Sequence, residues 1–429
     1  MRPISFPLIF TVLLGFAYSA QASAAISFRE AIPVDVSEIA QEKVDSPLPA
    51  DWYKRGTFME IYVRSFKDSD ADGIGDLKGL TQKLPYLKKL GITGIWLMPV
   101  MQSYDKDHGY ATQDYRAIEQ DYGSKADFEA LLKAAHGQGI GVIMDYLINH
   151  SAASNPLFIN ASASKQSAYH DWYIWQDEKD ENWSIYGKNP WHKEKIGYYF
   201  AGFWGKMPDF NLRNPEVLRY HHNNLRFWLN KGVDGFRFDA VGNLVENGAQ
   251  AWEMQPENYA IMRDIQALVY SYKNRYMVCE VPADPIGFAE SCGSSFAFGH
   301  QNNLIQAAKG NKGRISAAAR YFKKAPTQMA TFLSNHDNFA GERVFDQLAG
   351  DIATYKLAAA TYLTQPGIPF LYYGEEIGIA AGEGLYGDPA LRVPMSWTEN
   401  AKGFSENTPF REVARNIATH NVAAALKDP

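Results

Sequence analysis

An alternation of strand-like and helix-like segments is the feature that most constrains the fold of this chain of 429 residues. Short apolar segments recur between amphipathic stretches, so successive strands are joined by crossovers, which favours a parallel sheet. The expected strands span 58–65, 92–99, 141–147, 233–239, 276–281, 294–299, 329–335 and 368–373, and the expected helices span 76–90, 125–138, 215–231, 257–274, 313–324 and 352–364. Eight strands alternating with helices predict the α/β class and a closed (β/α)8 TIM barrel. An open, doubly wound sheet is the alternative, but no Gly-rich phosphate-binding turn follows the first strand.

The pattern also divides the chain into parts. A lead-in segment that contains three prolines covers residues 25–54, and the barrel covers 55–150 and 214–429. The segment 151–213 between the two barrel parts is rich in Trp, Tyr, Asn and Lys, and it is too long for an ordinary connection. Long insertions at the C-terminal face of a barrel are usually functional. We therefore predict an inserted subdomain B, after the third strand, that overhangs the active site.

Residues 1–24 resemble a secretory signal peptide. Arg2 supplies a positive charge, residues 8–17 form a short apolar run, and small residues at 20–24 offer a cleavage site. The run is short for a membrane span, although an uncleaved anchor is the alternative. We expect an exported protein, periplasmic or extracellular, with no membrane contact after cleavage.

The end of the chain departs from the barrel pattern. After the eighth expected strand, residues 410–426 are the only partial helical segment, so the eighth barrel helix and a C-terminal β-domain are missing from the pattern. A barrel that lacks this closing helix would expose apolar surface of its first and eighth strands. We therefore expect a truncated form with reduced stability and reduced or no activity.

Composition narrows the classes of partner. The net charge of -6 is small and is not gathered in blocks, so nothing favours binding to nucleic acid. Aromatic residues make up 14% of the chain, which suits stacking on neutral sugar rings and also suits a large core. Export permits a disulfide between the two cysteines, Cys279 and Cys292. Because Cys279 lies inside an apolar segment, a buried free thiol is equally consistent with the sequence.

Four of the expected strands end in carboxylates, where a barrel of this kind carries its catalytic residues. These are Asp145, Asp239, Glu280 and Asp337, and Arg237 lies two residues before Asp239 on the same side of its strand. Each carboxylate alone could be a cap or a surface ion pair, but four at equivalent strand ends predict one pocket. The guanidinium of Arg237 would keep Asp239 ionised in a partly dry site.

Convergent carboxylates fit either a divalent-metal hydrolase or a glycosidase. The metal alternative would need ligand-rich spacing, whereas His150 and His336 follow different strands. A glycosidase needs one ionised carboxylate and one protonated carboxyl group flanking the scissile bond. Asp239 suits the ionised role, and Glu280, after an apolar strand, suits the acid whose pKa is raised.

A second acidic motif follows the first expected strand, at 68–76, with the sequence Asp-Ser-Asp-Ala-Asp-Gly-Ile-Gly-Asp. Alternating carboxylates with a turn glycine form an oxygen cage for a hard cation, and without a cation their charges would repel. A solvated acidic loop is the alternative. An EF-hand calcium sensor is disfavoured because the bidentate Glu and the paired helices are lacking.

Taken together, the motifs resemble the α-amylase family, glycoside hydrolase family 13, from about Phe58 to Trp397. The motifs that carry the resemblance are Asp145–His150, Gly235–Asp239, Glu280 and Leu333–Asp337, supported by Gly94–Pro99, His108–Tyr110, Met207–Asn211 and Gly367–Gly374. Within the family, Met207–Asn211 resembles the branch between oligo-1,6-glucosidases and neopullulanases, which includes exported bacterial α-amylases.

The resemblance implies a role for each site residue. Asp239 would be the nucleophile, Glu280 the general acid/base and Asp337 the carboxylate that binds and distorts the sugar. This implies a retaining mechanism, in which the two reacting carboxyl groups lie about 5–5.5 Å apart. Substrate-binding roles fall to His108, Tyr110, Asp145, His150, Arg237 and His336, with Tyr110 stacked on the sugar; a structural role remains the alternative for either histidine, His150 or His336.

The acidic loop matches a cation-binding loop of the same family branch. The resemblance implies structural calcium, or magnesium, held by the side chains of Asp68, Asp70, Asp72 and Asp76 and by the carbonyl of Ile74. The cation would stabilise the loop rather than take part in the reaction.

Departures from the family pattern limit the prediction of substrate. Many starch-cleaving members carry Lys-His where this chain has Gly242 and Asn243, which puts in doubt the leaving-group subsites and a second calcium site near Asn149 and Asp209. The residue after the expected nucleophile is Ala240 rather than the Val typical of α-1,6-specific members of the family, so the resemblance favours α-1,4 bonds. We predict a monomeric α-amylase acting on α-1,4-glucans. A maltodextrin-specific α-glucosidase, a transglycosylase and a non-catalytic glucan-binding protein are the alternatives.

Overall fold

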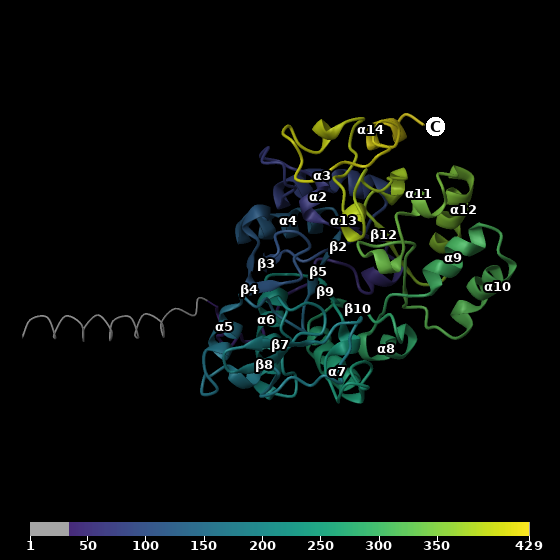
Figure 1. Cartoon of the computed structure of the whole chain (residues 1–429). Helices are drawn as coiled ribbons and strands as arrows, with labels where there is room; N and C mark the ends of the chain where they lie inside the picture. Colours follow the sequence, from purple (N-terminus) through teal and green to yellow (C-terminus); the bar gives the residue numbers. More distant parts are fainter. Residues whose placement is uncertain (1–33, 429) are drawn as a thin grey trace, which may run out of the picture.

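The computed structural model describes residues 34–428, so the predicted signal peptide and the first part of the lead-in lie outside the described residues (Figure 1). Its centre is a parallel sheet of seven strands in the order β10-β9-β5-β2-β1-β12-β11. The strands are β1 (Phe58–Ile61), β2 (Gly94–Leu97), β5 (Gly141–Tyr146), β9 (Gly235–Phe238), β10 (Tyr276–Cys279), β11 (Ala330–Thr331) and β12 (Ile368–Tyr372). Each lies within a segment predicted from the sequence.

The sixth expected strand, 294–299, is reduced to two parallel bridges. Ser295 pairs with Cys279 at the end of β10, and Phe296 pairs with Ala330 at the start of β11. This segment therefore joins the two edges of the sheet, and β1 pairs with β12 on the opposite side. The result is the closed (β/α)8 barrel that the alternation predicts.

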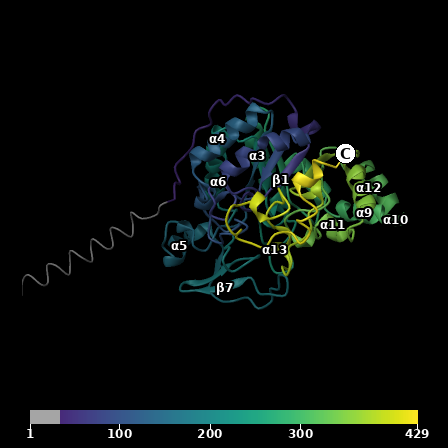
Figure 2. The same cartoon turned by 90° about the horizontal axis from the view of Figure 1, so that it is seen from above.

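Helices surround the barrel (Figures 1 and 2). The long ones are α3 (Leu77–Leu90), α4 (Lys125–Gly137), α6 (Pro215–Asn230), α7 (Pro256–Tyr270) and α12 (Ile352–Leu363), close to their predicted bounds. The predicted helix 313–324 is α10 (Lys312–Arg320) with a short 3-10 turn after it. Among the longer helices around the barrel, α8 (Pro285–Cys292) and α9 (His300–Ala308) were not predicted. The expected strand 58–65 was too long, because its second half forms the short helix α2 (Val63–Phe66).

Aromatic side chains fill the floor of the barrel. Phe58 of β1 stacks on Phe370 of β12 with ring centroids 4.5 Å apart, and Trp96 of β2 packs on Phe296 from the bridging segment. At the start of β9, a Cβ atom on Gly235 would lie 1.7 Å from the carbonyl oxygen of Tyr276, so only glycine allows the two strands this approach. Because aromatic side chains fill the floor, the polar residues gather at the other end of the barrel, where the strands end.

Subdomain B lies within the predicted insertion. It contains α5 (Pro156–Ala163) and an antiparallel sheet of three strands in the order β6-β8-β7. The strands are β6 (Trp175–Gln176), β7 (Trp191–Glu194) and β8 (Gly197–Phe200). A smaller antiparallel pair, β3 (Met101–Ser103) and β4 (Thr112–Ile118), follows β2. A bridge between His150 and Asp209 ties the insertion to the end of β5.

The region after β12 contains the short helices α13 (Asp388–Leu391) and α14 (Val422–Ala425). The prediction that the first strand would expose apolar surface is wrong, because all four residues of β1 are buried between β2 and β12. On β12, Leu371 is partly buried and lines a groove of about 780 Å³ that also borders α3, α12 and α14. Between residues 34 and 428, no helix combines the length and apolarity needed to cross a bilayer.

Candidate active site

Three neighbouring strands bring the predicted carboxylates together at the C-terminal end of the barrel. Asp145 lies on β5 directly opposite Arg237 of β9, and Asp239 follows β9. Glu280 follows β10, which pairs with β9 in register. Parallel strands in register end at the same edge of a sheet, so the three carboxyl groups meet there.

The guanidinium of Arg237 is the centre of this group. Its Nη1 atom donates to both carboxylate oxygens of Asp145, at 2.8 and 2.9 Å, and to Oδ1 of Asp239 at 2.8 Å. Its Nη2 atom donates to Oε2 of Glu280 at 2.7 Å. Arg237 is itself 1% exposed, so these contacts are shielded from water and are stronger than surface ion pairs. One buried cation therefore orients three carboxyl groups.

Burial sets the proton affinity of the two predicted reacting groups. It raises the pKa of Asp239 to about 6, against the lowering effect of Arg237. Burial likewise raises the pKa of Glu280 to about 7, with the charge of Asp239 and a hydrogen bond to that residue adding to the rise. Glu280 therefore holds its proton to higher pH than Asp239, as expected for an acid beside an ionised carboxylate. Asp145, the most enclosed of the three, has a pKa raised to about 6 by burial.

Asp337 completes the group from the loop after β11. Arg392, in the loop after α13, donates to Oδ1 of Asp337 at 3.1 Å and to the backbone carbonyl of His336 at 3.0 Å. Burial raises the pKa of Asp337 to about 7, while Arg392 lowers it. All three carboxyl groups predicted to be catalytic therefore reach one site, each beside an arginine.

His336 and Tyr110 form one wall of the site. Their rings stack with centroids 5.5 Å apart, and Nε2 of His336 lies 2.6 Å from the hydroxyl of Tyr110. The same hydroxyl donates to Oδ2 of Asp145 at 3.0 Å, and Nε2 of His336 lies 3.2 Å from Oδ2 of Asp337. The pKa of His336 is lowered by burial and by the nearby arginines.

The other two predicted histidines differ in exposure. His150 is 2% exposed and both its ring nitrogens contact protein groups, Nδ1 at 3.0 Å from Oδ1 of Asn149 and Nε2 at 3.1 Å from the carbonyl of Tyr110. Burial lowers the pKa of His150 to about 4, which favours the neutral ring. The side chain of His108 is 26% exposed, and its Nδ1 accepts from the backbone N–H of Tyr110. His108 is therefore the more accessible of the two.

Three residues in or beside the site were not predicted from the sequence. Trp96 donates its indole N–H to Asp145 at 3.2 Å, Arg392 binds Asp337, and Glu60 of β1 lies 2.5 Å from Nδ1 of His336. A charged residue in the middle of an apolar strand was a signal for Glu60. Nothing in the sequence indicated which side chain Arg392 would meet.

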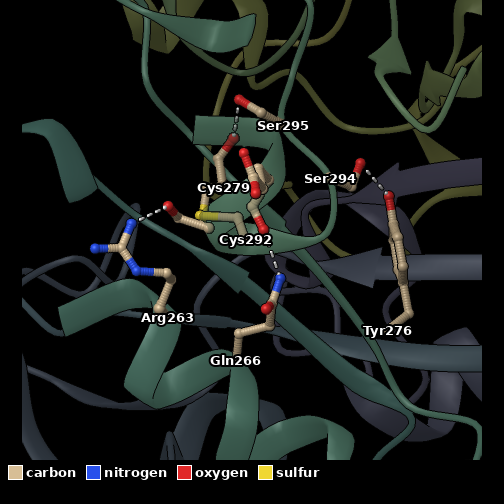
Figure 3. The surroundings of a disulfide bond; sticks show 9 residues. Arg263, Gln266, Tyr276, Cys279, Cys292, Ser294 and Ser295 are labelled. Carbon is tan, nitrogen blue, oxygen red and sulfur yellow. Dashed lines mark hydrogen bonds between the residues drawn. A yellow bond between two sulfur atoms is a disulfide. The ribbon is translucent and has the colours of Figure 1, made fainter. Parts of the chain in front are cut away.

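Cys279 and Cys292 form a disulfide, which settles the alternative left open by the sequence (Figure 3). The bond joins the end of β10, one residue before Glu280, to the end of α8. Both cysteines are fully buried. Around them, Ser295 donates to the carbonyl of Cys279 at 3.2 Å, and Gln266 of α7 donates to the carbonyl of Glu290 at 2.9 Å. The strand that carries Glu280 is thus anchored covalently and by hydrogen bonds.

The acidic loop before α3 brings three of its predicted ligands together. Asp68, Asp70 and Asp76 each offer an oxygen atom within 4.8 Å of the other two. Asp72 is not in this group of three, and its Oδ1 accepts the backbone N–H of Ile74 at 2.7 Å. Asp68 and Asp76 are buried and accept backbone N–H groups, those of Gly73 and Gly79 at 2.9 and 2.8 Å among them. An all-oxygen set of this kind fits a hard divalent cation.

Comparisons with known proteins agree with this geometry. The family model for the alpha amylase catalytic domain matches residues 60–429. The chain belongs to the α-amylase family. It is 38% identical to "Alpha-amylase 3" of Dictyoglomus thermophilum, covering 82% of this chain and 69% of that protein. It is 31% identical to "Oligo-1,6-glucosidase" of Parageobacillus thermoglucosidasius, covering 88% and 81% of the two chains.

A solved structure with a similar sequence also matches the fold. The alpha-amylase from H. orenii superposes with a TM-score of 0.73 at 36% identity, covering 86% of this chain and 76% of that one. As a member of the α-amylase family, the chain is a glycosidase whose family implies an α-glucan substrate. The predicted family and barrel are confirmed, whereas the names of the relatives include both an α-amylase and a glucosidase.

Proposed function

We propose that this chain is a retaining α-amylase that cleaves internal α-1,4 bonds of starch or maltodextrins. The observation that carries the proposal is the contact of one guanidinium, that of Arg237, with both Asp239 and Glu280. The two carboxyl groups also influence each other's pKa. Such closeness favours attack by a carboxylate over attack by an intervening water molecule, because inverting enzymes keep the groups about 6.5–9.5 Å apart.

In the proposed reaction, Asp239 attacks the anomeric carbon while Glu280 protonates the leaving oxygen. The bond from the anomeric carbon to the leaving group breaks, and a covalent glycosyl–enzyme forms. Glu280, now ionised, then takes a proton from water, which displaces Asp239 and restores the starting α-configuration. Arg237 keeps Asp239 ionised at neutral pH.

The remaining site residues are proposed to bind the sugar next to the scissile bond. Asp337, His336 and His150 surround the position of its hydroxyl groups, and the ring of Tyr110 offers a stacking surface. His108 lies at the accessible edge of this wall. Asp145 acts through Arg237, since Nη1 of Arg237 binds both of its carboxylate oxygens.

Proton NMR of maltoheptaose in the first minutes of reaction tests this proposal. Internal cuts that give α-anomeric products support a retaining, endo-acting α-amylase. β-Anomeric products would overturn the retaining mechanism. Release of glucose alone from one end would instead favour the α-glucosidase alternative, which the glucosidase among the relatives makes worth testing. Longer products would favour a transglycosylase.

Structural calcium is a second part of the proposal. Asp68, Asp70 and Asp76 converge, and Asp72 and the carbonyl of Ile74 would complete the set implied by the family resemblance. Magnesium could occupy the same ligands, although Ca²⁺ tolerates the irregular geometry of such a loop better. The cation would hold the loop that leads into α3.

Export is also part of the proposal, because residues 1–24 have the pattern of a signal peptide. A disulfide in the described part of the chain is consistent with an oxidising compartment. We propose a monomer in the periplasm or outside the cell. We expect the full chain to be secreted and a chain that begins at residue 25 to be retained in the cell.

A further inference from the structure

Glu60 is a buried carboxyl group that the proposed reaction does not use. It lies on β1, two residues after Phe58, so both side chains point into the barrel. Phe58 stacks in the apolar floor, and Glu60 lies above it at 2% exposure. A carboxyl group at this depth costs free energy unless a partner satisfies it. The partner is His336.

The contact between Glu60 and His336 is direct and short. Oε1 of Glu60 lies 2.5 Å from Nδ1 of His336. On its other side, the same imidazole presents Nε2 to the hydroxyl of Tyr110 and to Oδ2 of Asp337, at 2.6 and 3.2 Å. His336 itself is fully buried. The position of the proton between Glu60 and Nδ1 therefore determines whether Nε2 donates or accepts a hydrogen bond in the active site.

The arginine partners of each carboxyl group in the site indicate which carboxyl group is protonated. Asp145, Asp239 and Glu280 all bind Arg237, and Asp337 binds Arg392. In the described part of the chain, Glu60 forms no ion pair with an arginine or lysine. Burial raises the pKa of Glu60 well above its usual range, and the charge of Asp337 adds to the rise. Glu60 is thus the carboxyl group of this cluster best suited to remain protonated.

Most of the charged neighbours of Glu60 favour its neutral form. Asp337, Asp145 and Glu375 raise the pKa of Glu60, whereas Arg237 lowers it. Around His336, burial is the main cause that lowers the pKa, followed by Arg392, Arg237 and His108. A neutral acid beside a neutral imidazole is therefore favoured over a buried ion pair.

The hydrogen-bond geometry favours one tautomer of the imidazole. If Nδ1 accepts from the Glu60 carboxyl group, Nε2 carries the proton and faces two oxygen atoms, those of Tyr110 and Asp337. The hydroxyl proton of Tyr110 is then free to bind Asp145, at 3.0 Å. In the opposite tautomer, the lone pair of Nε2 would face Oδ2 of Asp337 at 3.2 Å, and Asp145 would lose the proton of Tyr110. In the first arrangement, Tyr110 and Asp337 share the proton on Nε2, and the contacts of Nδ1 with Glu60 and of Tyr110 with Asp145 each have a proton of their own.

We propose that Glu60 is a positioning residue that donates a hydrogen bond to Nδ1 of His336 and so makes Nε2 of His336 a hydrogen-bond donor toward Asp337 and the bound sugar. The part that concerns the sugar rests on the proposed function. The part that concerns the protons does not, because it describes the protein without substrate. No net proton is gained or lost in the reaction through this pair.

Neutron diffraction from a perdeuterated crystal of the protein, grown near pH 6 without substrate, tests the proton positions directly. We expect a deuteron between Glu60 and His336 that belongs to the carboxyl oxygen, and a second on Nε2 of His336. A deuteron bonded to Nδ1, with Nε2 bare, would overturn the proposal. Because this measurement needs no activity, its failure and the failure of the proposed α-amylase reaction are distinguishable.

A matched pair of substitutions at Glu60 tests the consequence for turnover. Glu60→Gln keeps a neutral donor of nearly the same shape, so kcat/KM on maltoheptaose should stay within about tenfold of the unaltered chain. Glu60→Leu removes the donor and leaves Nδ1 without a partner, so kcat/KM should fall about 10²-fold. A folded Glu60→Gln variant that loses as much activity as Glu60→Leu would contradict the proposal.

The pH profile of Glu60→Gln adds a readout that a merely structural role would not change. If Glu60 is neutral, its replacement by a neutral amide removes no charge, and both limbs of the profile keep their pH values. If Glu60 is ionised, the replacement removes a negative charge near Asp337 and the reacting carboxyl groups. Both limbs would then move to lower pH, and the proposal would be wrong.

Discussion

Glu280 accepts a hydrogen bond from Arg237 across two neighbouring strands, with 2.7 Å between Oε2 of Glu280 and Nη2 of Arg237. The other terminal nitrogen of the same guanidinium, Nη1, donates to Oδ1 of Asp239 at 2.8 Å. A rigid, planar cation therefore fixes the two carboxyl groups relative to each other more precisely than two separate partners could.

Removal of either reacting carboxylate should abolish turnover without unfolding the protein. Asp239→Asn and Glu280→Gln keep the shapes of the side chains, so kcat on maltoheptaose should fall at least about 10³-fold, while Tm stays within a few degrees. Steady-state kinetics and thermal melts of the same samples provide the measurement. Glu290→Gln, at an exposed glutamate, is the matched control and should leave both quantities unchanged. Full activity of Asp239→Asn would exclude it as nucleophile.

The pH dependence of turnover should be bell-shaped. The reaction needs Asp239 ionised, with a pKa of about 6, and Glu280 protonated, with a pKa of about 7. Activity should therefore rise through about pH 6 and fall through about pH 7, in a profile of kcat/KM against pH. With α-maltosyl fluoride, whose leaving group needs no proton, the alkaline limb should disappear. An alkaline limb that persists with the fluoride would belong to a group other than Glu280.

The barrel and its catalytic carboxylates could be predicted because each signal is local. A strand that ends in a carboxylate carries both the apolar pattern and the reactive group, as Glu280 does after β10. The sixth strand was placed correctly but forms only two bridges, one through Ser295 to β10 and one through Phe296 to β11. The number of residues that pair depends on the neighbouring strands, so the sequence of the segment alone does not predict it.

Contacts between distant segments could not be predicted from the sequence. Glu60 and His336 are 276 positions apart, and only closure of the barrel between β1 and β12 brings them together. The disulfide could not be predicted either, because an apolar strand is compatible with both a free thiol and a disulfide. The course of α8 decides between the two, because its last residue, Cys292, lies beside Cys279 at the end of β10.

Removal of divalent cations should lower the stability of the protein. Asp68, Asp70 and Asp76 would then repel one another, so Tm should fall when a chelator is added and recover with added Ca²⁺. Asp70→Asn should lower Tm without chelator and remove most of the further change. Asp45→Asn, at an exposed aspartate of the lead-in, is the control and should keep the full response. A chelator effect that survives in Asp70→Asn would place the cation elsewhere.

The disulfide should stabilise the fold and hold β10 in place. It closes a loop with a sequence separation of 13 residues, so the double substitution Cys279→Ala and Cys292→Ala should lower the free energy of unfolding by about 3 kcal/mol. Because Glu280 directly follows Cys279, kcat should fall as well. Chemical denaturation and kinetics measure the two effects. A strong reductant should destabilise the unaltered chain but not the double variant, since only the former has a bond to break. Equal sensitivity of both proteins would show that the reductant acts elsewhere.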